Sequence, residues 1–141
     1  MNDCTRLSLG VLAIGALALA PSIALASTDQ DAIMEAVIRY GRTKNLIECI
    51  LVSETSSTDY GDPSPGLQQR LKRARIPVYP ASDSRCVGSS RVFWIGPVRQ
   101  TDRQAEVPAG QFHASALGRP TYVLIRNWFG RWRVKAVTPV E

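Results

Sequence analysis

The sequence predicts an α+β domain in which an N-terminal helix packs on a curved antiparallel sheet of about four to five strands. Residues 28–41 repeat apolar side chains with helical spacing, and a second helical pattern follows residue 64. From residue 78 onward the apolar runs are short and are separated by glycine, proline and polar residues. Such runs are typical of strands joined by turns.

Residues 1–26 have the pattern of a secretory signal peptide. A polar start with Arg6 precedes an apolar run from Leu7 to Ala20, and the small-x-small sequence Ala24-Leu25-Ala26 follows. We expect cleavage between Ala26 and Ser27, which leaves one small domain, residues 27–141, in the periplasm or outside the cell. An uncleaved anchor is the alternative, but the glycines and alanines of the run favour cleavage. The expected membrane contact is through this segment only.

The chain carries 17 Lys and Arg against 12 Asp and Glu, a formal net charge of +5. A basic exported domain favours anionic partners such as acidic proteins or membrane surfaces. Nucleic acid is not an expected partner for an exported chain. Only three of the basic residues after residue 26 are lysines, so a general arginine bias would also explain the charge.

Cys49 and Cys86 remain after the predicted cleavage. An even number of cysteines in an oxidising compartment predicts one disulfide between them. Because Cys49 lies in an apolar run, a small buried thiol is the alternative.

The first helix is predicted to begin after Thr28 as N-cap and to end at Gly41. Its buried stripe contains Ile33, Val37 and Tyr40. Residues 45–53 then form a short apolar run that favours a strand.

The second helix is predicted to begin with Ser64 as N-cap and Pro65 as the first helical residue. Leu67 and Leu71 mark its buried side. Its last turns hold the densest basic cluster of the chain, namely Arg70, Lys72, Arg73 and Arg75. These charges complement the helix dipole, so a solvated helix face is one interpretation and a patch for an anionic partner is the other.

Three strand patterns precede the C-terminal hairpin. Residues 78–79 form a short extended piece, residues 91–96 are apolar enough for a central strand, and residues 103–116 alternate weakly. Pro108 and Gly110 interrupt the third pattern, which predicts a kinked or edge strand.

Residues 121–137 predict a hairpin that turns between Asn127 and Gly130. Alternation places the aromatic and aliphatic residues of each arm on a core face, and the basic residues of the second arm on the other face. The predicted core-facing set is Tyr122, Leu124, Trp132, Val134 and Ala136; the outward set is Arg131, Arg133 and Lys135, with Val123, Ile125 and Val137. Trp128 and Phe129 fall at the turn, where exposed rings would form a contact site.

The leading helix and the final hairpin resemble those of nuclear-transport-factor-2-like domains of the cystatin-like superfamily. The resemblance rests on Tyr122, Gly130, Trp132 and Val134. It implies a cone-like sheet around the first helix, with a cavity lined by Phe93, Tyr122, Leu124 and Trp132. Residues of this kind more often simply fill a core, and we favour that interpretation for these four. The resemblance implies no reaction, because this superfold serves enzymes, binding modules and dimerisation domains.

No residue pattern predicts a catalytic, metal or cofactor site. His113 has no second imidazole in a metal-ligand spacing, and no nucleotide-binding or nucleophile motif is present. Asp59 and Tyr60 would serve as an acid–base pair only at the mouth of a cavity. Turn formation already explains Asp59.

The leading functional hypothesis is therefore an exported, non-catalytic domain that binds a protein partner or a small ligand. Trp128, Phe129 and the basic cluster of the second helix are its candidate contacts. A cavity enzyme of the same superfold, of isomerase or hydrolase type, and a structural domain that forms a homodimer through its sheet are the alternatives.

Overall fold

The structure is a computed structural model that describes residues 22–44, 47–53, 59–111 and 119–139, with side chains described from Asp29 onward. Its elements follow in the order α1 (Ser22–Thr43), β1 (Cys49–Val52), α2 (Pro65–Arg73), β2 (Tyr79–Pro80), the 3-10 helix η1 (Ser84–Cys86), β3 (Val92–Ile95), β4 (Arg99–Gln100), β5 (Gln104–Gln111), β6 (Thr121–Arg126) and β7 (Trp132–Thr138). These elements confirm the predicted α+β class.

The strands form one open sheet that has more strands than predicted and is mixed rather than antiparallel. Its order is β2-β1-β3-β5-β6-β7, and β4 pairs with β5 beside this path, which gives seven strands. β1 is parallel to both β2 and β3, whereas β5 is antiparallel to β3, β4 and β6, and β6 is antiparallel to β7. A crossover through α2 joins β1 to β2, and a crossover of this kind is what makes two neighbouring strands parallel.

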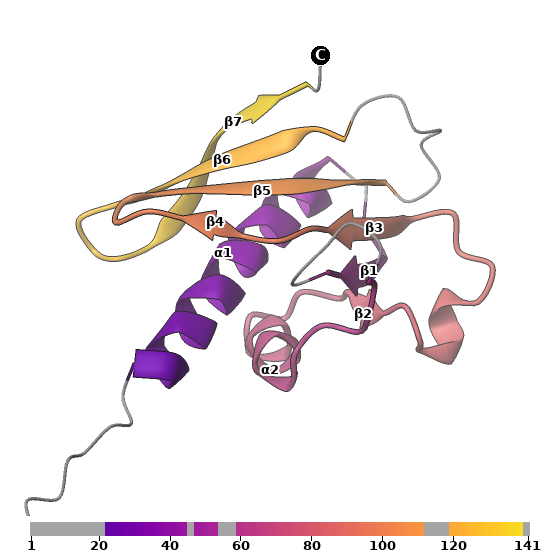
Figure 1. Ribbon diagram of the computed structural model, residues 1–141. Helices are drawn as coiled ribbons and strands as arrows, with labels where there is room; N and C mark the ends of the chain where they lie inside the picture. Colours follow the sequence, from indigo (N-terminus) through magenta and orange to yellow (C-terminus); the bar gives the residue numbers. More distant parts are fainter. Residues whose placement is uncertain (1–21, 45–46, 54–58, 112–118, 140–141) are drawn as a thin grey trace, which may run out of the picture.

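The core lies between the sheet and the two helices. Figure 1 shows α1 crossing one face of the sheet diagonally. From α1, Ile33, Val37 and Ile38 are fully buried in the same cluster as Leu67 and Leu71 of α2. The sheet contributes alternate residues to this cluster, namely Ile50, Val52, Phe93, Ile95, Ala105, Val107, Ala109, Tyr122, Leu124 and Trp132.

Helix α1 begins at Ser22, earlier than the predicted start after Thr28, and ends at Thr43. The residues before Thr28 are mainly alanine, leucine and isoleucine, which continue a helix more favourably than a single cap would stop it. Thr28 therefore lies inside the helix of the full chain. The predicted cleavage position, Ala26–Ser27, falls within α1 and remains a prediction. Among the described residues, no helix has the length and apolar composition of a membrane span.

The predicted start of α2 is confirmed. Ser64 is the N-cap, and its hydroxyl oxygen accepts a hydrogen bond from the backbone N–H of Leu67 at 3.0 Å. Pro65 occupies the first helical position, where its missing N–H costs nothing. The same hydroxyl donates to Oδ1 of Asp31 at 2.8 Å, so the cap also fastens α2 to α1.

Strand β5 is an interior strand, which corrects the prediction of an edge position. It pairs with β6 on one side and with β3 and β4 on the other. Pro108 is accommodated where the neighbour changes from β4 to β3. Its carbonyl accepts a hydrogen bond from Gly96 there, at 2.7 Å, and the next residue, Ala109, donates to Pro120 on the β6 side. The missing N–H of Pro108 thus falls at a break in the ladder.

The β6–β7 hairpin has the predicted arms but an altered face pattern. Tyr122, Leu124 and Trp132 are buried as predicted. Leu124 pairs with Val134 and Val123 pairs with Ala136, so Lys135 is the extra residue of a β-bulge. A bulge shifts the alternation by one residue. Consequently Ala136 is exposed and Val137 packs against the core, the reverse of the prediction.

The predicted Cys49–Cys86 disulfide is present. It joins β1 to η1 across a sequence separation of 37 residues. Both cysteines are buried, so the bond lies against the folded domain rather than in a free loop. It closes the segment that contains α2 and β2.

The Cys49→Ala, Cys86→Ala double variant should unfold at lower urea concentration than the native protein. Removing the cross-link frees the unfolded chain, which should reduce the free energy of unfolding by about 2–4 kcal/mol. The midpoint and slope of urea unfolding measure this loss. A Val87→Ala variant, changed beside Cys86 at an exposed side chain, should stay within about 0.5 kcal/mol of the native protein. Equal midpoints for the double variant and the native protein would contradict a stabilising disulfide.

Candidate binding surfaces

The turn between β6 and β7 is held in one conformation by Asn127. Its backbone N–H donates to the carbonyl of Arg131 at 2.9 Å, and its own carbonyl accepts from Gly130 at 3.0 Å. Its side-chain Oδ1 accepts from the backbone N–H groups of Phe129 at 3.0 Å and Arg131 at 2.8 Å. Gly130 has φ +74°, a conformation that glycine adopts without a Cβ clash. The residues between Asn127 and Gly130 are therefore fixed by hydrogen bonds on both sides.

This fixed turn carries the two most exposed aromatic side chains of the described residues. Trp128 is 90% exposed and Phe129 is 88% exposed. We call these two residues the aromatic tip. Large adjacent rings in water are unusual for a domain that buries its other tryptophans, Trp94 and Trp132. The structure thus places both predicted turn residues on the surface.

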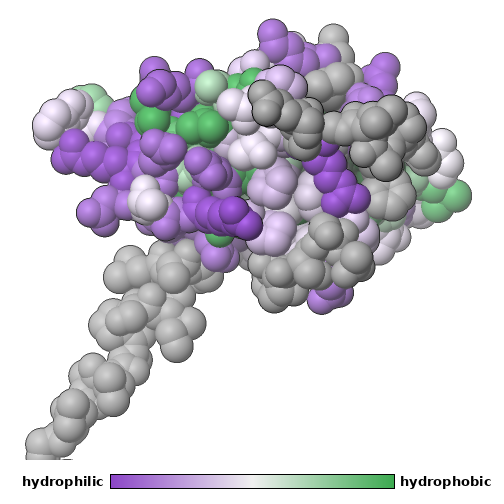
Figure 2. Space-filling model, turned by 45° about the horizontal axis from the view of Figure 1, so that its top comes forward, coloured by the Kyte–Doolittle hydropathy of each residue, from purple (hydrophilic) through white to green (hydrophobic). Residues whose placement is uncertain are grey.

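Arginines surround the aromatic tip. The Arg103 guanidinium carbon lies 5.1 Å from the ring centroid of Trp128, within cation–π range. Arg131 and Arg133 are exposed at the start of β7. Figure 2 shows purple, hydrophilic side chains around paler ones at the end of the molecule that the hairpin forms. Two exposed rings and several exposed arginines therefore lie together at this end of the molecule.

Arg126 connects this end of the sheet to α1. Its guanidinium lies 3.6 Å from Oδ2 of Asp29, the carboxylate oxygen that also accepts a hydrogen bond from Gln100 at 2.9 Å. The backbone N–H of Arg126 donates to the carbonyl of Arg103 at 2.8 Å. The β4–β5 turn, the hairpin and the N-terminal half of α1 are thereby joined beneath the tip. Sequence analysis missed Arg103, because only strand pairing brings it beside Trp128. It also missed Arg126, whose guanidinium carbon lies 5.8 Å from the ring centroid of Trp132.

The basic cluster of α2 does not form one surface. Arg70 donates through Nε to Oε2 of Glu35 at 2.8 Å, and Glu35 also binds Arg39 at 2.7 Å. Arg70 thus holds α2 to α1. Lys72 lines a pocket beside β2, whereas the neighbouring Arg73 and Arg75 are exposed. The four basic side chains therefore do not act as a single patch, because Arg70 is paired with Glu35.

The four residues predicted to line an inner cavity lie in the core. Phe93 is 1% exposed, and Tyr122 contacts both it and Tyr40 edge to face, with ring centroids 6.2 and 5.8 Å apart. Leu124 and Trp132 belong to the same buried cluster. Burial raises the pKa of the Tyr122 phenol, with a smaller contribution from Tyr40.

The polar residues weighed for chemistry do not meet at a common site. Asp59 is exposed, and the Tyr60 ring packs edge to face on Trp94 at 6.0 Å. Neither residue lines the pocket beside β2. Within the described ranges no group of three His, Cys, Asp or Glu side chains is arranged to hold a metal ion. His113 lies outside the described residues.

Comparisons of the chain with protein-family models, with curated proteins and with solved structures find no match. The resemblance to nuclear-transport-factor-2-like domains remains a prediction.

Asn127→Ala should loosen the aromatic tip without unfolding the domain. The change removes two side-chain hydrogen bonds to backbone N–H groups, so we expect a loss of about 1 kcal/mol in unfolding free energy. Amide hydrogen exchange at Phe129 and Arg131 should accelerate, while exchange in β5 stays unchanged. Gln104→Ala, at an exposed position in β5, is the matched control. Unaltered exchange at Phe129 and Arg131 would show that Asn127 does not fix the turn.

Proposed function

We propose that this protein is an exported, non-catalytic binding module that holds an acidic protein partner through its aromatic tip. The observation that carries the proposal is the exposure of Trp128 and Phe129, 90% and 88%, on a turn fixed by hydrogen bonds. A preformed surface loses little conformational entropy on binding. Tryptophan and arginine are also enriched among the residues that contribute most to binding at protein interfaces.

The charge around the tip supports an acidic partner. Arg103 contacts Trp128, and Arg131 and Arg133, which follow the turn, are exposed. Asp29 is paired with Arg126, and Asp102 beside Arg103 is an exposed carboxylate, so exposed arginines outnumber carboxylates among these residues. A partner with an apolar pocket rimmed by carboxylates would bury the rings and pair the arginines. A second copy of this chain fits less well, because tip-to-tip contact would bring like charges together.

The predicted export of the protein also supports a binding role. The predicted signal peptide and the Cys49–Cys86 bond agree with a protein that works in an oxidising compartment such as the periplasm. Partners would then be other exported proteins. The four residues predicted to line a cavity are buried in the core, which supports a binding surface at the periphery over a cavity enzyme.

Site-specific photocrosslinking tests the proposal. A benzophenone side chain replaces Phe129, which keeps an aromatic ring at the tip, and irradiation is carried out in an extract of exported proteins from the host. We expect one acidic partner to crosslink. Trp128→Ser in the same chain should weaken its binding about 30-fold or more, the loss typical of a central interface residue.

The benzophenone side chain placed at position 87 instead of position 129 is the control. Val87 is 84% exposed and directly follows η1, a segment that Figure 1 shows at the end of the molecule away from the β6–β7 turn. It should not crosslink to the partner. Equal crosslinking from positions 87 and 129, or crosslinking that Trp128→Ser leaves unchanged, would reject the tip as the contact site.

A further inference from the structure

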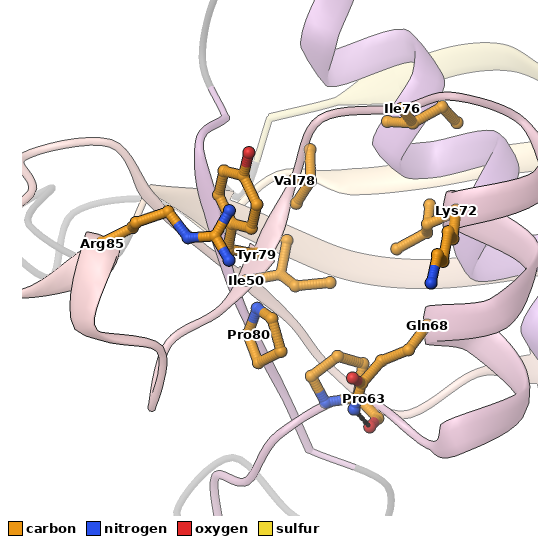
Figure 3. Close-up of a pocket in the computed structure, with 10 residues that line it drawn as sticks. Ile50, Pro63, Gln68, Lys72, Ile76, Val78, Tyr79, Pro80 and Arg85 are labelled. Carbon is orange, nitrogen blue, oxygen red and sulfur yellow. Dashed lines mark hydrogen bonds between the residues drawn. The ribbon is translucent and has the colours of Figure 1, made fainter.

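A pocket of about 320 Å³ lies between α2 and the edge strand β2, apart from the aromatic tip. Figure 3 shows its lining side chains converging from α2, from β1 and β2 and from η1. The volume is at the lower end of the range for small-molecule sites. The proposed function assigns no role to this pocket.

The floor of the pocket is apolar. Ile50 of β1 and Leu71 of α2 are buried there, and Val78 closes the floor beside β2. Pro63 and Pro80 add flat, apolar sides. A ligand would therefore gain free energy by placing an apolar body against this floor.

Two cations stand on opposite sides of the opening. Lys72 projects from α2, and Arg85 projects from η1 across the pocket from it (Figure 3). The Arg85 guanidinium carbon lies 3.9 Å from the ring centroid of Tyr79, and its Nε donates to Oδ1 of Asp83 at 3.0 Å. Stacking and the ion pair hold this guanidinium in place over the pocket.

The opening retains positive charge after these pairings. The backbone N–H of Arg85 and then its side chain lower the pKa of Asp83, so this carboxylate is ionised and balances Arg85. The other nearby carboxylate, Asp62, accepts hydrogen bonds from the backbone and hydroxyl of Ser82. No ion pair to Lys72 exists among the described residues, since no carboxylate there lies within 4.0 Å of its ammonium group. Lys72 is the cation left for a ligand.

The disulfide keeps the two sides of the pocket together. Cys49 precedes Ile50 of the floor, and Cys86 follows Arg85 of the rim. Because the bond joins the residues next to Ile50 and Arg85, it limits how far the Arg85 guanidinium can move from the apolar floor. Such preorganisation is what a small site needs to bind without a large entropic loss.

We propose that this pocket binds a small monoanionic carboxylate with a compact apolar body. The body lies against Ile50, Leu71 and Val78, and the carboxylate reaches Lys72, with Arg85 on the opposite rim. A neutral ligand of the same shape leaves the Lys72 charge without a partner. A purely polar anion does not displace water from the apolar floor. The ligand therefore needs both the carboxylate and the apolar body.

Amide chemical-shift titration of the purified protein tests this with three probes: hexanoate, its neutral counterpart hexanamide, and acetate, which lacks the apolar body. Hexanoate should give saturable shifts at Ile50, Leu71, Lys72 and Val78. Hexanamide and acetate should each bind at least about tenfold more weakly, as expected for loss of a charge-assisted contact or of the buried body.

Lys72→Gln and Arg73→Gln form a matched pair of variants. Both remove one charge from adjacent exposed positions of α2, but only Lys72 lines the pocket. We expect Lys72→Gln to weaken hexanoate about tenfold and Arg73→Gln to leave it within twofold. The Cys49→Ala, Cys86→Ala variant should also bind more weakly wherever it stays folded.

Several results would overturn the proposal. These are hexanoate shifts that do not saturate or that map away from the pocket, equal affinity for hexanamide, and equal losses in Lys72→Gln and Arg73→Gln. Crosslinking from Phe129 is independent of all of them, so a failure here leaves the proposed function standing.

Discussion

The packing of α1 on the inner face of the sheet is the interaction on which the rest of the structure depends. Ile33, Val37 and Ile38 are fully buried, and Tyr40 meets Tyr122 edge to face at 5.8 Å. This stripe occupies the space that a cone-shaped fold would offer to a ligand. Aromatic and aliphatic side chains make up most of this interior, and Ser53 is its buried polar residue among those the structure describes. The surfaces suited to recognition are therefore peripheral.

The two peripheral surfaces belong to the two halves of the mixed sheet. The antiparallel half ends in a tight hairpin, so a short turn fixed by Asn127 can present rings to solvent. The parallel half needs a crossover from β1 to β2, and α2 supplies it. A pocket lies between this crossover helix and the edge strand β2, and the Cys49–Cys86 bond joins residues next to Ile50 and Arg85 of its lining. Strand direction thus decides what kind of site each half supports.

The binding surfaces were only partly predictable from sequence. Trp128 and Phe129 were identified because a two-arm alternation leaves the turn residues outside the core. The basic cluster of α2 was identified as a unit, yet Arg70 is bound to Glu35 and only Lys72 reaches the pocket. Charge density along a helix does not say which neighbour each side chain will meet. Arg103 and Arg85 gained their positions from pairing and loop geometry that no local pattern encodes.

The sequence by itself determined those features whose physics is local or covalent. Ser64 and Pro65 begin α2 because a hydroxyl cap and a preset φ act within one turn. The two cysteines that follow the predicted signal peptide predicted a bond, and the structure contains it. Tertiary structure alone decided the mixed sheet, the interior place of β5 despite Pro108, and the bulge at Lys135 that exposes Ala136 and packs Val137 against the core. Each of these depends on which distant strand supplies hydrogen bonds. Which strands pair depends on how all the core side chains pack together against α1, and residue spacing does not encode this packing.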